Sequence, residues 1–69
     1  MTPAELKAWR LRLGLSREEA GERLGVSASC VKTYELGRRK AGGPPLQIPK
    51  LVQLACGAVA HGILEYRGP

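Results

Sequence analysis

The segment Ser16–Gly37, SREEAGERLGVSASCVKTYELG, decides the fold of this 69-residue chain. Its capping residues stand where two short helices joined by a tight turn would need them. Ser16 and, three residues later, Glu19 have the spacing of a capping box at the start of the first helix. Gly25 can end that helix in a left-handed conformation, and Ser27 can cap the second helix. The segment therefore predicts a helix, a tight turn and a second helix that closes at the segment's end.

The apolar and polar residues of this segment lie on different faces of the predicted helices. The positions that point inward are Ala20, Leu24, Val26, Val31 and Tyr34. The second helix keeps small or polar residues outward, as a helix must if it is to enter the major groove of DNA. Two helices that merely pack together would explain the apolar positions but not the placement of the polar ones.

A glycine inside the first of these helices, Gly21, costs roughly 1 kcal/mol of helix stability relative to alanine. We attribute this glycine to a close approach of the second helix, because a bulky side chain there would push the pair apart. The alternative is a weak helix residue that the fold merely tolerates.

One further helix is predicted before this segment and one after it, with no convincing strand. The first spans about residues 3–13. Its start signal is Thr2, Pro3 and Glu5. Its apolar stripe is Leu6, Trp9 and Leu13. The last has Pro49 in its first turn and ends near Gly62, with a broad apolar face. That face consists of Ile48, Leu51, Val52, Ala55, Ala58 and Val59. We expect this last helix to be continuous, a break at Gly57 being the alternative.

Basic side chains outnumber acidic ones, 11 to 6, which gives a formal net charge of +5. The excess lies in residues 25–50, on the second helix of the pair and in the loop after it. This charge favours a polyanionic partner, either nucleic acid or an anionic membrane surface. A chain of this length forms one domain at most.

No pattern in the sequence predicts a metal site, a cofactor, a small-molecule ligand or catalysis. Cys30, Cys56 and His61 are conceivable metal ligands, but a fourth is missing and their spacing is not that of a zinc site. We expect two buried thiols in a reducing cytosol and a histidine at a helix end. No signal peptide or membrane-spanning segment is evident. The expectation is a soluble, cytoplasmic protein that is not an enzyme.

The run LGLSREEAGERLGVSASCVKTYELGRR, with the helix before it, resembles the lambda-repressor/Cro family of helix-turn-helix DNA-binding domains, also called XRE-type. The resemblance implies an all-α, compact four-to-five-helix domain over residues 1–62, with the helix-turn-helix formed by helices 2 and 3, and a C-terminal tail over residues 63–69. It also implies a structural ion pair between Arg10 and Glu35, which holds helix 1 against helix 3. Two residues replace the alanine and glutamine common in the family, namely Gly21 and Arg17, and the linker after helix 3 is longer.

Helix-turn-helix proteins place the start of the second helix of the pair against base edges. The outward residues there, expected to read bases, are Ala28, Ser29, Lys32 and Thr33. Because none of them is an arginine, asparagine or glutamine, direct readout should be modest, and phosphate contacts and DNA shape should supply more of the affinity. The expected phosphate-binding residues are Arg17, Ser27, Arg38, Arg39 and Lys40. The alternative is an ordinary solvated face followed by a solvated basic run.

These expectations favour a sequence-specific transcriptional regulator of bacterial or phage type, a repressor that binds operator double-stranded DNA. We expect a homodimer, because one such motif reads too few bases for useful specificity. The last helix and the tail residues Ile63, Leu64 and Tyr66 are the expected dimer surface, unless the monomer's own core consumes that apolar face. The alternative function is an antitoxin-type protein that binds a partner protein and regulates its own operon.

Overall fold

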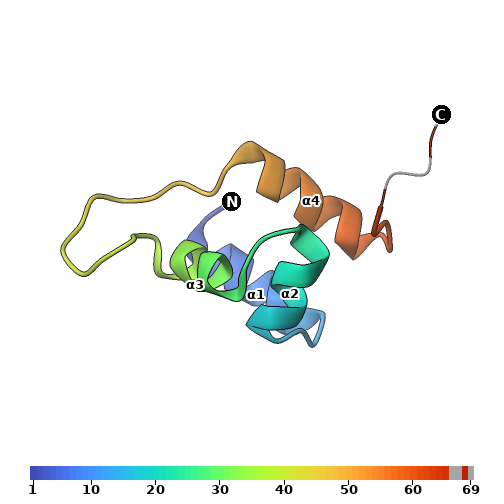
Figure 1. Ribbon diagram of the computed structural model, residues 1–69, viewed down its shortest axis with the longest axis horizontal. Coiled ribbons are helices and arrows are strands. Elements are labelled where there is room, and N and C mark those ends of the chain that lie inside the picture. Colours follow the sequence, from blue (N-terminus) through green and yellow to red (C-terminus); the bar gives the residue numbers. More distant parts are fainter. Residues whose placement is uncertain (66–67, 69) are drawn as a thin grey trace.

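The computed structural model describes residues 1–65 and 68, which form four helices and no strand. Their bounds are Pro3–Arg12 for α1, Arg17–Leu24 for α2, Ala28–Leu36 for α3 and Lys50–Ala60 for α4. Figure 1 shows α4 lying on one side of the other three helices, with the chain between α3 and α4 projecting away from them. The all-α prediction is confirmed.

The helix starts follow the capping residues that the sequence predicts. The hydroxyl of Thr2 accepts a hydrogen bond from the Glu5 backbone N–H at 3.1 Å, and the Glu5 carboxylate accepts one from the Thr2 N–H at 2.7 Å. Ser16 and Glu19 form the same reciprocal box at the start of α2. These bonds satisfy backbone donors that have no partner within the helix. Two of the predicted helix starts are thus fixed by local hydrogen bonds.

The turn between α2 and α3 needs glycine at two positions for two different reasons. Gly25 ends α2 with φ of 78°, in the left-handed region that glycine enters without steric cost. At Gly21, an added Cβ would lie 2.5 Å from the carbonyl oxygen of Val26 and 3.1 Å from the carbonyl carbon of Ser27. The predicted close approach at Gly21 is confirmed, and it is made by the backbone of the turn that leads into α3.

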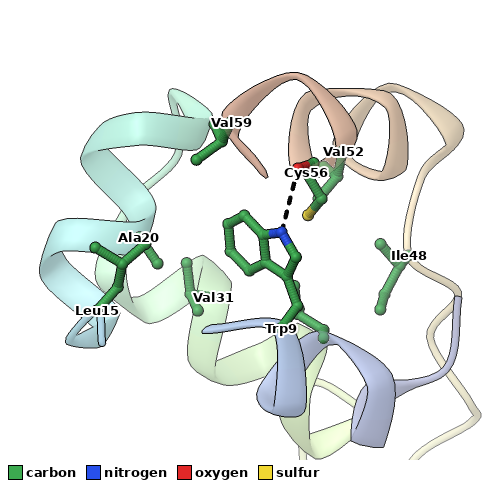
Figure 2. Close-up of a cluster of buried hydrophobic side chains, with 9 residues drawn as sticks. Trp9, Leu15, Ala20, Val31, Ile48, Val52, Cys56 and Val59 are labelled. Atoms are coloured by element: carbon green, nitrogen blue, oxygen red, sulfur yellow. Dashed lines mark hydrogen bonds between the residues drawn. The ribbon is translucent and has the colours of Figure 1, made fainter. Parts of the chain in front are cut away.

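The core lies between α4 and the other helices and is almost entirely aliphatic. Its buried side chains are Leu6, Trp9, Leu15, Ala20, Val31, Ile48, Val52, Cys56 and Val59. Figure 2 shows Trp9 pointing from α1 toward α4, where its indole Nε1 donates a hydrogen bond to the carbonyl oxygen of Cys56 at 3.1 Å. One tryptophan therefore fills the centre of the core and joins α4 to α1.

The two thiols differ in burial. Cys56 is buried as predicted, and burial raises the pKa of its thiol. Cys30 is only half-buried, so the prediction of two buried thiols is wrong for this residue. Its place on α3, beside the residues that face outward, explains the difference.

The helix α4 departs from prediction at its start and on its face. Pro49 caps the helix from outside instead of lying in its first turn, and its carbonyl accepts hydrogen bonds from Val52 and Gln53. The helix runs unbroken through Gly57, as expected. Leu51, predicted on the apolar inner face, is 80% exposed, and Cys56 takes the buried position instead. Nearly every residue of α4 is apolar, so periodicity alone does not determine which face is buried.

Candidate nucleic-acid interface

The helices α2 and α3 pack against each other through the turn at Gly25, and α1 packs against α3. This arrangement buries Ala20 and Val31 completely and leaves Ser29 and Lys32 exposed on the opposite face of α3. The face that remains is the one that the helical spacing of its polar residues predicts. It is followed directly by the basic loop after α3.

The outward side of α3 carries the four residues expected to read bases. Ser29 and Lys32 are exposed, whereas Ala28 and Thr33 are half-buried. The Thr33 hydroxyl donates a hydrogen bond to the Ser29 carbonyl oxygen at 2.9 Å. While that bond holds, Thr33 offers an incoming base an acceptor and a methyl group but no donor, so Lys32 and Ser29 are the two exposed donors of the set.

Sequence reasoning missed one residue of this face, Leu36, whose side chain is 59% exposed. It lies four residues after Lys32 and seven after Ser29, which places all three on one stripe of the helix. This spacing is visible in the sequence and could have identified Leu36 as part of the outward face. A large apolar side chain here gives the far end of the stripe a group suited to a thymine methyl.

Ser27 stands at the N-terminus of α3 as its capping residue. Its Oγ accepts a hydrogen bond from the Cys30 backbone N–H at 3.0 Å, and the residue is exposed. Accepting this bond leaves the hydroxyl hydrogen available for donation. Ser27 can therefore cap the helix and donate to an anion at once.

The structure contains the ion pair between Arg10 and Glu35. Arg10 Nε lies 2.6 Å from Glu35 Oε2, and Arg10 Nη2 lies 3.1 Å from Oε1. A third bond, from Arg10 Nη1 to the carbonyl oxygen of Leu15 at 3.0 Å, ties the pair to the chain between α1 and α2. The Glu35 side chain is only 2% exposed, so the pair fixes the rotation of α3 from inside.

The pKa of each partner reflects this burial and pairing. Burial alone would raise the pKa of the Glu35 carboxyl, but the hydrogen bond and charge of Arg10, with the charge of Arg17, lower it below its ordinary value. The hydrogen bond from Arg10 to Glu35 raises the pKa of the guanidinium against an opposing effect of burial. Both groups are therefore charged at neutral pH.

Arg17 is the first residue of α2 and lies against the same carboxylate, a contact that the sequence did not predict. Its Nε and Nη2 atoms both lie 3.4 Å from Glu35 Oε1, and 38% of its side chain is exposed. The only sequence signal was the presence of arginine where the resembling family often has glutamine. Arg17 thus occupies an intermediate place between the buried pair and the surface.

The basic loop, residues 38–45, begins immediately after α3. Its end is pinned to its start by a hydrogen bond from the Leu46 N–H to the Gly37 carbonyl oxygen at 2.7 Å. The three cations at its start are exposed and form no ion pair with another described residue: Arg38, Arg39 and Lys40. In Figure 1 the loop extends beyond the end of α3. Unpaired cations on a projecting loop suit an extended polyanion.

The described residues contain no group of three histidine, cysteine or acidic side chains that could hold a metal ion. Cys30, Cys56 and His61 accordingly do not come together, and His61 lies exposed at the end of α4, as predicted. Within the same residues, no helix has both the length and the apolar character needed to cross a membrane.

The helices of this chain match a known domain family. A family model described as a helix-turn-helix domain matches residues 4–58, which includes all four helices except the first residue of α1 and the end of α4. No curated protein and no solved structure matches the chain. The two helices that give such domains their name are α2 and α3, the pair joined by the turn at Gly25.

Proposed function

Because the chain belongs to the helix-turn-helix domain family, we propose that it is a sequence-specific transcriptional regulator, a repressor of bacterial or phage type that binds operator DNA in the cytoplasm. The observation that carries this proposal is the outward face of α3, where Ser29 and Lys32 are exposed while Val31 on the inner face is buried. A helix presented in this way fits the width of the major groove. The domain comprises residues 1–62, and residues 63–69 form a tail.

Four residues at the start of α3 read the bases: Ala28, Ser29, Lys32 and Thr33. Lys32 donates to guanine O6 or N7, whereas Ser29 donates or accepts. Only Lys32 belongs to the residue types that make the bidentate pairs which discriminate by about 1–3 kcal/mol, so direct readout is modest. The sequence preference then comes in large part from DNA shape and from the positions of phosphates.

The phosphate contacts come from both ends of α3 and from the start of α2. Their residues are Arg17, Ser27, Arg38, Arg39 and Lys40. The exposure of the three loop cations and the free hydroxyl hydrogen of Ser27 support this assignment. Each neutralised phosphate releases counterions, so affinity falls steeply as salt rises.

The protein acts as a homodimer through the outer face of α4 and the tail. Support comes from four large apolar side chains that the monomer leaves exposed: Leu51, Leu54, Ile63 and Leu64. The buried side of α4 serves the monomer's own core, so the two roles use different faces of one helix. Tyr66, the third tail residue assigned to this surface, lies outside the described residues.

The same exposed apolar residues are what an antitoxin-type protein would use to bind a different partner, and this is the second candidate function. Purification distinguishes the two. A homodimer elutes without other proteins, whereas a stoichiometric complex with a second protein would favour the antitoxin.

A gel-shift titration against DNA upstream of the protein's own gene, at two salt concentrations, tests the proposed function. Specific binding that weakens steeply with salt is the expected result. Lys32→Ala and Thr33→Ala should change the site preference, whereas Lys50→Ala, at an exposed lysine of α4, should not. If Lys32→Ala and Thr33→Ala leave the preference unchanged, the reading face is misassigned.

A further inference from the structure

Two arginines contact the buried carboxylate of Glu35, although one would be enough to neutralise its charge. Arg10 alone engages both oxygens, at 2.6 Å to Oε2 and 3.1 Å to Oε1, and so neutralises the charge. Arg17 nevertheless directs two of its nitrogens to Oε1, each at 3.4 Å. The cluster of two guanidinium groups and one carboxylate therefore carries a net charge of +1.

The two arginines differ in how tightly they are held. Arg10 is 8% exposed and also binds the Leu15 carbonyl oxygen, so its donors are largely used. The Arg17 side chain is 38% exposed, and its contacts with Glu35 are longer. Of the five N–H donors of a guanidinium, Arg17 uses two on Glu35, and its others have no hydrogen-bond partner among the described residues. Arg17 is thus restrained on one side and open on the other.

We infer that Glu35 is a positioning residue for DNA binding: it restrains the guanidinium of Arg17 so that its remaining donors receive a phosphate of the bound strand. This inference rests on the proposed function. A long arginine side chain ordinarily loses much rotamer freedom when it binds a phosphate. Here part of that freedom is already lost in the free protein, and Arg10 prevents the carboxylate from repelling the phosphate.

Two alternative roles of Glu35, competition with DNA for Arg17 and stabilisation of the fold alone, predict different effects on DNA affinity. If Arg17 had to leave Glu35 in order to bind DNA, removing the carboxylate charge would raise the affinity for DNA. If Glu35 only stabilised the fold, its replacement would lower the affinity equally with and without Arg17. Positioning requires that the effect of Glu35 on affinity disappear when Arg17 is absent.

A double-mutant cycle on operator binding separates these outcomes. Arg17→Ala should lower the affinity about tenfold, because a hydrogen bond to a charged group contributes about that factor. It should also reduce the slope of log affinity against log salt by about 0.9, the loss of one phosphate contact. Glu35→Gln should lower the affinity severalfold in the wild-type background and leave it unchanged beside Arg17→Ala. Equal effects in both backgrounds, or a gain of affinity, would overturn the inference.

A second variant covers the possibility that Glu35→Gln does not fold. Arg17→Lys keeps the Arg10–Glu35 pair and the positive charge but loses the planar fork that Glu35 restrains. We expect it to keep most of the salt slope and to bind more weakly than wild type. The matched control is Arg12→Lys, at an exposed arginine of α1 outside the proposed DNA-binding residues, which should bind as wild type does. Wild-type affinity for Arg17→Lys overturns the inference alone, whereas a wild-type protein that binds no operator overturns the proposed function as well.

Discussion

The helices α3 and α4 have similar lengths, 9 and 11 residues, but they are fixed in the fold by different means. Ser27 and Gly37 cap the two ends of α3, and a buried ion pair sets its rotation. No side chain caps the start of α4, which is held by apolar packing and by hydrogen bonds from Trp9 to Cys56 and from the N-terminal ammonium to Gln53. Polar contacts therefore determine which face α3 exposes, whereas α4 exposes the apolar residues that its core packing does not use.

The largest effect should follow from breaking the ion pair that holds α3. Arg10→Met leaves the Glu35 carboxylate buried without its main partner, which should lower the free energy of unfolding by about 3–5 kcal/mol. Chemical denaturation followed by circular dichroism measures this loss. Arg39→Ala, at an exposed cation, serves as the control and should change stability by no more than about 0.5 kcal/mol. Equal denaturation midpoints for Arg10→Met and wild type would show that apolar packing alone fixes the rotation of α3.

Acid should weaken the same Arg10–Glu35 ion pair gradually, with a smaller loss of folding free energy. The pKa of Glu35 is lowered in the folded protein from its ordinary value of 4.5, so the native state prefers the ionised carboxylate. The stabilisation is fully present above the unfolded pKa and is lost as pH falls through the lower, folded value. Wild type should therefore lose stability below about pH 4.5, and Glu35→Gln should lose less over the same range. The glutamates of the two capping boxes titrate in both proteins, so the difference between the curves isolates Glu35.

Trp9 joins α4 to the rest of the fold, as Arg10 fixes the rotation of α3. Trp9→Phe removes the donor to the Cys56 carbonyl and leaves a small cavity, which should cost about 1–2 kcal/mol of folding free energy. Hydrogen exchange should then accelerate more in α4 than in α3. Equal acceleration in both helices would mean that the bond contributes to the whole core and not to α4 in particular.

The two helical glycines of the molecule should respond to alanine with opposite signs. At Gly21 the new Cβ would meet backbone at 2.5 Å, whereas at Gly57 nothing lies within 4 Å. Gly21→Ala should destabilise by about 1 kcal/mol net, because overpacking costs about 1–3 kcal/mol and leaving a helical glycine returns roughly 1 kcal/mol. Gly57→Ala should stabilise by about 0.5–1 kcal/mol. Thermal unfolding of both variants tests this difference, and melting temperatures that shift in the same direction would contradict it.

The same contrast explains how much could be predicted from the sequence. The segment around α2 and α3 could be predicted from interactions between residues close in the sequence. Ser16 and Glu19 bond within one helical turn, and Gly25 ends α2 without a distant partner. The inward face of α3 follows from the spacing of Val31 and Tyr34. Such signals depend on neighbours in the chain, so they could be recognised without the fold.

What could not be predicted depends on residues that are distant in the sequence. Leu51 and Cys56 are both apolar residues of an apolar helix, and which of them is buried depends on how α4 packs against Trp9 and the rest of the core. The contact of Arg17 with Glu35 joins residues 18 positions apart and depends on how α2 and α3 cross. The exposed residues of α3 and the basic loop after it could be predicted from charge and spacing, but the side-chain partners of each cation could not.

The smallest effect on stability should come from the exposed face of α4, and its readout is association. Leu51 and Leu54 are 80% and 59% exposed, so replacing both with lysine should change the free energy of unfolding of the monomer by only about 0.5 kcal/mol per site. The same change places two charges on the proposed dimer surface, where desolvating them opposes association. Analytical ultracentrifugation should therefore find a dimer for wild type and a monomer for the double variant. A wild-type monomer at all concentrations would contradict the dimer, and a double variant that unfolds would show that this face belongs to the core. Either result would contradict the proposal that α3 presents polar contacts to DNA while α4 presents apolar ones to a second copy of the chain.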